Sequence, residues 1–170
     1  MLKLGSLSLS SKAILAPLER VSDIGFRSLC FKEGAAITWT EMIYASDFSK
    51  GLPSAIDLVD THDNKTITGI QLLIDRTAAK DNWGVDTLNK ALETLELRSN
   101  SDKPEWKNIS AIDLNFGCPS PQLSKRGCGP SQLRRRSKML NLFTELTKWK
   151  RDTNLTNIQA VGCKIRLGMN

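Results

Sequence analysis

Five short apolar segments, separated by helical patterns and loops, constrain the fold of this 170-residue chain most strongly. We expect strands over residues 12–17, 35–40, 66–74, 109–114 and 159–167. We expect helices from Ser22 or Asp23 to Gly34, from Asp81 or Asn82 onward, and over residues 131–151, with a surface loop over 98–107. Strands that alternate with helices are typical of parallel βα units, so the sequence predicts an α/β protein.

Composition narrows the class of partner. Lys and Arg number 24 against 18 Asp and Glu, which gives a net charge of +6 and favours an anionic partner, nucleic acid more than membrane. No apolar run is long enough to cross a bilayer. The first residues lack the layout of a secretory signal, so we expect a cytoplasmic location.

Cysteine and histidine usage argues against metal chemistry. The chain has four cysteines without a C-x-x-C pair and a single histidine, His62, which we expect on a loop or at the surface. We therefore predict neither a metal site nor a disulfide framework. We expect Cys30 and Cys163 to be packing residues.

The segment from residue 109 to 133 carries the strongest candidate for chemistry. A strand ends at Asn115, and Gly117, Cys118 and Pro119 form a turn before a basic loop. Pro119 fixes its own φ and biases Cys118 towards an extended backbone, which places the thiol at the strand's carboxyl end. A reactive thiol and a small buried hydrophobe are both open interpretations of Cys118 at this point.

The stretch Asn115-Phe116-Gly117-Cys118-Pro119 resembles the N-x-G-C-P signature of the tRNA-dihydrouridine synthases. Four further blocks resemble that family in the same order along the chain: residues 15–23 with Phe26 and Arg27, Thr40-Glu41-Met42, residues 69–72, and residues 164–168. The resemblance implies a (β/α)₈ TIM barrel. A complete barrel has eight strands in about 250 residues, so we expect only about the first five βα units here. On this interpretation residues 1–170 form a partial FMN-binding barrel, without its C-terminal half or the family's helical tRNA-binding domain.

The resemblance also implies an activity: FMN-dependent reduction of uridine to 5,6-dihydrouridine in tRNA, with NADPH as the usual reductant. Cys118 would donate the proton, because a thiol is mostly protonated at neutral pH yet can give its proton up. Residues implied to bind the cofactor are Pro17, Leu18 (where the family usually has Met), Gln71 and Lys164. Residues implied to contact the substrate are Asn115 and Arg166, and an ion pair is an equal alternative for Arg166.

A basic cluster follows the Cys118 turn. It consists of Lys125, Arg126, Arg134, Arg135, Arg136 and Lys138. Cations at the start of a helix oppose its dipole, so they have no evident role in folding. Contact with the tRNA backbone is the functional interpretation, and a solvated helix start is the alternative.

Two other functions remain open from the sequence. One is a different FMN barrel oxidoreductase of the dihydroorotate dehydrogenase type, which shares an N-x-x-C-P turn. The other is an inactive half-barrel that binds RNA or a partner chain. Five open strands leave two unpaired edges, which predicts possible self-association.

Overall fold

A computed structural model describes residues 1–59, 66–75, 79–101 and 106–167. His62 and the end of the 164–168 block lie outside the described residues. The strands are β1 (Leu2–Leu4), β2 (Leu7–Leu9), β3 (Ile14–Leu15), β4 (Ile37–Tyr44), β5 (Thr68–Leu73), β6 (Ile109–Asn115) and β7 (Ala160–Lys164). The α-helices are α1 (Ile24–Lys32), α2 (Ala45–Phe48), α3 (Pro53–Ile56), α4 (Val85–Ser99), α5 (Pro121–Lys125) and α6 (Arg136–Asp152). The 3₁₀ turns are η1 (Asp57–Val59), η2 (Ala79–Gly84) and η4 (Gly129–Arg134).

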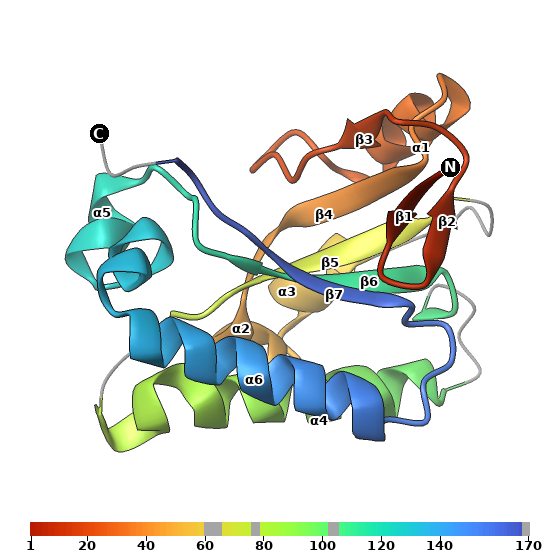
Figure 1. The fold of residues 1–170 in the computed structure, drawn as a ribbon. Helices are drawn as coiled ribbons and strands as arrows, with labels where there is room; N and C mark the ends of the chain where they lie inside the picture. The colour runs from red at the N-terminus through yellow and green to blue at the C-terminus, as the bar shows by residue number, and fades with distance from the viewer. Residues whose placement is uncertain (60–65, 76–78, 102–105, 168–170) are drawn as a thin grey trace.

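The main sheet has the order β3-β4-β5-β6-β7, and every neighbouring pair is parallel. The sheet curls into an open half-barrel, and the carboxyl ends of β5, β6 and β7 point to the same side as α5 (Figure 1). The predicted α/β fold of five parallel units is therefore confirmed as part of a TIM-type barrel. Within the described residues, β3 and β7 form the two edges of this sheet.

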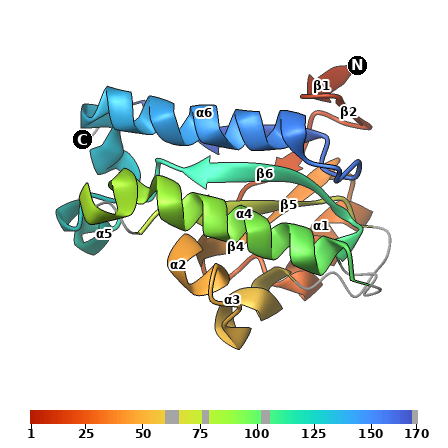
Figure 2. The ribbon, with the colours of Figure 1, turned by 90° about the horizontal axis from the view of Figure 1, so that it is seen from below.

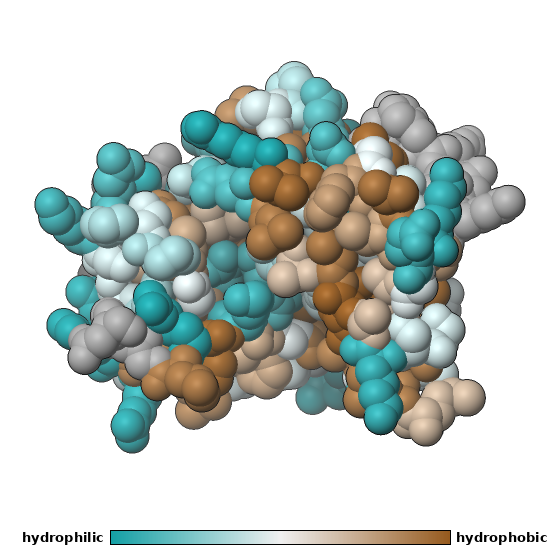
Figure 3. All heavy atoms as spheres, turned by 90° about the horizontal axis from the view of Figure 1, so that it is seen from above, coloured by the Kyte–Doolittle hydropathy of each residue, from teal (hydrophilic) through white to brown (hydrophobic). Residues whose placement is uncertain are grey.

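The two faces of the sheet carry different residues because side chains alternate along a strand. Helices α4 and α6 lie side by side across the outer face (Figure 2). The main core lies between them and the sheet, and includes Ile70, Ile112, Leu88 and Leu146. Gln71 and Asp113, next to Ile70 and Ile112 in sequence, therefore face the inside of the half-barrel. This inner side opens to solvent in a hollow bordered by apolar and hydrophilic side chains (Figure 3).

Several expected boundaries are wrong. β4 continues to Tyr44 with an irregularity between Trp39 and Met42, so Glu41 and Met42 lie within the strand rather than after it. β3 has two residues, and β7 stops at Lys164, which leaves Arg166 beyond the strand. Within the part of the chain that the structure describes, β3 and β7 each pair with a strand on one side only.

The helix expected over residues 131–151 begins later, at Arg136. Gly129 and Pro130 start a 3₁₀ turn, and the backbone of Arg135 (φ −116°, ψ 60°) separates this turn from α6. Helix α4 likewise begins at Val85, after Gly84 adopts a left-handed conformation with a φ of 97°.

Two side chains correct the sequence analysis, and a third agrees with it. Trp106, expected in a surface loop, is buried in the main core, where its ring centroid lies 6.2 Å from that of Phe48. Cys163, expected to pack, is exposed, because β7 is an edge strand. Cys30 is half-buried on α1, which agrees with a packing role.

A hairpin of β1 and β2 precedes the barrel strands and was not predicted. Leu7 and Leu9 pack with Ala111 and Ala160 in a second apolar cluster, so the hairpin joins residues from β6 and β7. Gly5 forms the turn with a φ of 59°, and a Cβ there would lie 2.6 Å from the carbonyl oxygen of Gln159. Gln159 is more than 150 positions from Gly5 in the sequence, so local sequence patterns could not predict this packing of the hairpin.

Gly69 makes room for the Trp39 ring inside the half-barrel. A Cβ at Gly69 would overlap three carbons of that ring. We expect Gly69→Ala to lower the free energy of unfolding by about 1–3 kcal/mol, measured by urea denaturation, because overpacking forces side chains or backbone to shift. Gly162→Ala is the matched control on β7, since its nearest contact would be an ordinary 3.7 Å to Asp113 Oδ1. Equal effects of the two substitutions would contradict the prediction.

Candidate functional site

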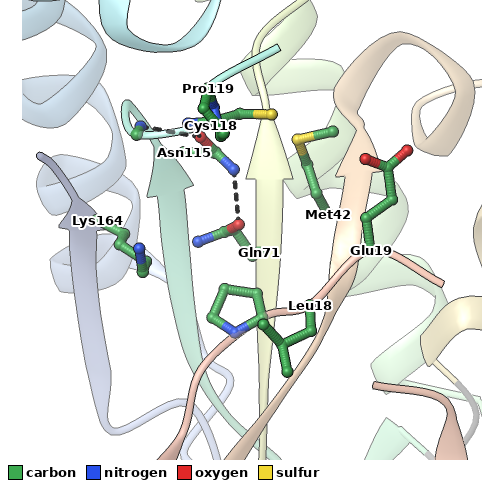
Figure 4. Close-up of a pocket in the computed structure, with 10 residues that line it drawn as sticks. Leu18, Glu19, Met42, Gln71, Asn115, Cys118, Pro119 and Lys164 are labelled. Carbon is green, nitrogen blue, oxygen red and sulfur yellow. Dashed lines mark hydrogen bonds between the residues drawn. The ribbon is translucent and has the colours of Figure 1, made fainter. Parts of the chain in front are cut away.

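A cavity of about 300 Å³ opens at the carboxyl ends of the barrel strands (Figure 4). Its lining residues are Pro17, Leu18, Glu19, Met42, Gln71, Asn115, Gly117, Cys118, Pro119 and Lys164. Six of these are residues that the sequence analysis selected, and they come from segments spread over almost 150 positions of the chain. The parallel arrangement brings them together because all the strands end at the same rim.

A hydrogen-bond chain joins the polar residues of β5 and β6. Asn115 Oδ1 accepts from the backbone N–H groups of Gly117 (3.0 Å) and Cys118 (2.9 Å), which fixes the turn that carries the thiol. Asn115 Nδ2 donates to Gln71 Oε1 at 2.8 Å, as Figure 4 shows. Gln71 Nε2 in turn donates to Asp113 Oδ2 at 2.6 Å. The Asn115 side chain thus stabilises the turn that carries Cys118, whether or not a ligand is bound.

The apolar wall formed by Pro17 and Leu18 belongs to a compact loop. The Ser22 hydroxyl accepts from the Leu18 N–H and donates to the Leu18 carbonyl, both at 3.0 Å. The Glu41 carboxylate accepts from the backbone N–H of Arg20, whose φ is +61°. Glu41, a member of the T-E-M block, therefore holds this loop against β4.

The Arg27 side chain, from the same sequence block, has a structural role. It is buried, and its Nη1 donates to the carbonyl oxygens of Ser22 (2.9 Å) and Leu58 (3.3 Å). The guanidinium thus links the loop after β3 to η1 rather than facing the cavity.

Asp113 is a titratable group of this region that the sequence analysis missed. Burial raises the pKa of its carboxyl to about 6, while the hydrogen bond from Gln71 and the charge of Lys164 act in the opposite direction. Asp113 lies two residues before Asn115, on the same face of β6, and this spacing was the available signal.

Cys118 lies at the edge of a small apolar cluster. It packs, with Tyr44, against the buried residues Met42, Leu123 and Cys128. The Cys128 thiol is fully buried near the carbonyl oxygens of Asp75 (3.8 Å) and Arg126 (3.7 Å), and burial raises its pKa. Cys118 lines the cavity and Cys128 does not, so the two thiols are in different environments.

Four residues of the basic cluster line a second cavity, of about 470 Å³. Its lining residues are Trp83, Ser124, Lys125, Arg126, Gly127, Ser131, Arg134 and Arg135. The Trp83 ring lies beneath two cations: the Arg135 guanidinium is 5.8 Å from its centroid, and Lys138 also stacks on it. Desolvation there, and then the charge of Arg135, lower the pKa of Lys138.

The structure therefore separates the predicted contacts into groups. Lys125, Arg126, Arg134 and Arg135 line the second cavity and not the first, and Arg166 is not among the residues that line either. Four further residues line the first cavity without having been selected: Glu19, Met42, Gly117 and Pro119. All four lie inside recognised blocks, so the selected residues beside them in the sequence were the available signal.

No cluster of three or more metal-ligating side chains occurs within residues 1–59, 66–75, 79–101 and 106–167. Among the helices of this described part, none has both the length and the apolar character required to cross a membrane.

Comparisons with known proteins cover most of the chain. The family model described as "Dihydrouridine synthase (Dus)" matches residues 14–82 and 94–170. The chain is 30% identical to the tRNA-dihydrouridine(47) synthase [NAD(P)(+)]-like protein of Xenopus tropicalis, over 75% of this chain and 18% of that protein. It is also 30% identical to a probable tRNA-dihydrouridine synthase of Treponema pallidum, over 77% of this chain and 34% of that protein.

A fungal relative extends the match further along the chain. The tRNA-dihydrouridine(47) synthase [NAD(P)(+)] of Coprinopsis cinerea is 30% identical over 93% of this chain and 20% of its own length. The chain thus spans between about a fifth and a third of the length of these curated relatives. Because the family model matches most of the chain, we conclude that the chain belongs to the dihydrouridine synthase family.

Proposed function

We propose that the cavity beside Cys118 serves the reduction of uridine to 5,6-dihydrouridine in tRNA, with FMN as the hydride donor. The observation that carries the proposal is that Pro17, Leu18, Gln71, Asn115, Cys118 and Lys164 line one cavity. The family match supports dihydrouridine synthesis over the dihydroorotate dehydrogenase type of reaction. The names of the relatives support tRNA as the substrate.

The cavity has the chemistry that an isoalloxazine ring requires. Pro17, Leu18 and Met42 supply apolar surface for the flat ring, and Gln71 and Lys164 supply polar groups for its edge. Gln71 keeps one N–H and one lone pair beyond its contacts with Asp113 and Asn115, so it can still bind a ligand. Lys164 would stabilise negative charge on the ring edge. FMN, when bound, would supply a hydride to a pyrimidine ring.

Cys118 is the proposed proton donor to the other carbon of the reduced double bond. The backbone hydrogen bonds from Gly117 and Cys118 to Asn115 hold the thiol at the cavity wall. A fixed donor is effective because proton transfer requires the reacting atoms within hydrogen-bonding distance. NADPH is the proposed reductant, and the NAD(P)(+) in the relatives' names supports a nicotinamide donor.

The direct test is to incubate the chain with in vitro transcribed tRNA, FMN and NADPH, and to measure dihydrouridine by mass spectrometry of the digested RNA. We expect dihydrouridine only when all three components are present. FMN is to be supplied in large excess, because none of the residues proposed to hold it is assigned to its phosphate group. Absence of dihydrouridine under saturating FMN would contradict the proposal for this chain.

The second cavity is the proposed contact for the tRNA backbone. Lys125 and Arg134 are exposed and both line this cavity, and cations suit phosphate groups. We expect each of the substitutions Lys125→Ala and Arg134→Ala to weaken tRNA binding, and to reduce the slope of log K against log salt by about 0.7–0.9 per lost contact.

Lys90→Ala is the matched control for this measurement, because Lys90 is an exposed cation on α4 that lines neither cavity. Filter binding at several salt concentrations gives the slopes. A slope that is unchanged in the Lys125 and Arg134 variants would assign these residues to a solvated surface instead.

Self-association through the edges at β3 and β7 stays a separate prediction.

A further inference from the structure

The carboxyl group of Asp113 lies inside the half-barrel and has no part in the function proposed above. Only 7% of the residue is exposed. It lines a cavity of about 350 Å³ together with Trp39, Pro17, Cys163 and Lys164. Burying an ionisable group costs free energy unless a partner forms hydrogen bonds with it. The hydrogen-bond partner of Asp113 therefore indicates the role of this residue.

The partner of Asp113 is the side-chain amide of Gln71. Gln71 is 1% exposed and donates from Nε2 to Asp113 Oδ2 at 2.6 Å. A primary amide can rotate by half a turn and exchange its donor and acceptor ends, so its environment must decide the orientation. Gln71 Oε1 faces the other way and accepts from Asn115 Nδ2 at 2.8 Å.

Both ends of this hydrogen-bond chain are groups that cannot exchange roles. At one end the backbone N–H groups of Gly117 and Cys118 can only donate, which makes Asn115 present its NH₂ group to Gln71. At the other end an ionised carboxylate can only accept, which makes Gln71 present its NH₂ group to Asp113. The two ends therefore select the same orientation of the central amide.

We propose that Asp113 is a positioning residue that fixes the orientation of the Gln71 amide and thereby completes the hydrogen-bond chain to the Cys118 turn. The remaining N–H and lone pair of Gln71 then lie in a defined order at the cavity wall. They suit a ring edge that carries an acceptor and a donor side by side, such as the imide edge shared by flavins and uracil. The statement that this ligand is a flavin rests on the proposed function, whereas the role of Asp113 does not.

Among the described residues, few charged or titratable groups lie near Asp113. Lys164 on β7 favours the ionised form. The thiol of Cys163, also on β7, interacts with the Asp113 carboxylate. β5 contributes the uncharged amide of Gln71, β4 contributes the Trp39 indole, and the segment after β3 contributes Pro17. The ionised carboxylate of Asp113 only accepts hydrogen bonds, whereas its protonated form can also donate one. The preference of the Gln71 amide for a single orientation is therefore expected to weaken in acid.

The test is an NMR titration of the isotope-labelled 170-residue chain in the absence of flavin and tRNA. The carboxyl carbon of Asp113 is expected to titrate with a midpoint near pH 6. The side-chain amide resonances of Gln71 and Asn115 are expected to shift with the same midpoint. In Asp113→Asn, which has almost the same shape, the shift of both amides at this pH is expected to disappear.

Asp75→Asn is the matched control. Asp75 is another buried aspartate that follows β5, but it accepts from the Ser46 backbone N–H (3.0 Å) and hydroxyl (2.6 Å) rather than from Gln71. Its substitution is expected to leave the Gln71 and Asn115 titrations in place. A purely structural role of buried aspartates predicts similar spectra for both variants.

Amide resonances of Gln71 and Asn115 that do not follow the Asp113 titration would overturn the proposal, and the unchanged chain alone decides this point. The experiment contains neither flavin nor tRNA. A chain that shows the coupled titration but makes no dihydrouridine would therefore lose the proposed function and retain the role of Asp113. A chain that makes dihydrouridine without the coupled titration would retain the proposed function and lose the proposed role of Asp113.

Discussion

Replacement of Cys118 by alanine is expected to lower the rate of uridine reduction by about 10²- to 10⁴-fold, the range that positioned general acids contribute. The thiol is the side chain proposed to supply the proton, and alanine has no proton to give. The methyl group of alanine keeps part of the contact with the apolar cluster around Leu123, so the fold is expected to survive. Single-turnover assays with prereduced FMN isolate this step from reduction by NADPH.

Cys30→Ser is the matched control, since Cys30 is a half-buried thiol on α1, outside the cavity. Its rate of uridine reduction is expected to equal that of the unchanged chain. The affinity of the Cys118→Ala variant for tRNA is also expected to be unchanged, because the proton is transferred only during the reaction. A Cys118→Ala variant with full activity would show that another group donates the proton.

The second large effect concerns stability and pH, and it comes from Asp113. Its pKa is about 6 in the folded chain against an ordinary 3.8, so the folded state binds more protons than the unfolded state between these values. The stabilisation from this group is fully present below about pH 4 and is lost as the pH rises through 6. The gap between the two pKa values corresponds to a loss of about 3 kcal/mol.

Other carboxyl groups also titrate in this range, so the effect is best measured as a difference between two chains. We expect Asp113→Asn to gain about 3 kcal/mol in free energy of unfolding relative to the unchanged chain between pH 4 and pH 7, because asparagine does not ionise. Urea denaturation at several pH values measures this difference. A difference that stays constant with pH would show that the Asp113 carboxyl titrates alike in the folded and unfolded states.

The stability effect of Asp113 conflicts with the positioning role proposed for the same residue. An ionised Asp113 destabilises the fold at neutral pH, yet it is the acceptor that the proposed orientation of Gln71 requires. Local losses of stability are common at functional sites, where geometry for a ligand competes with burial. The Asp113→Asn variant is thus expected to be more stable and less well ordered at Gln71.

The sequence by itself was enough to predict the βα alternation and most of the cavity. Apolar runs such as that of β6 are local signals, and so is the turn imposed by Gly117 and Pro119. The residues of the cavity were implied by the resemblance of the five blocks to a known family. Parallel strands present their carboxyl ends at one rim, which explains why these residues meet there.

Only the tertiary structure decided the features that depend on contacts between distant segments. The burial of Trp106 and the packing of the β1–β2 hairpin depend on partners far along the chain. The links from Asp113 through Gln71 to Asn115 join two strands whose residues lie more than 40 positions apart. Local patterns specify which residues form a strand and which face they share, but the register between strands determines which side chains meet, and that register exists only in the folded sheet.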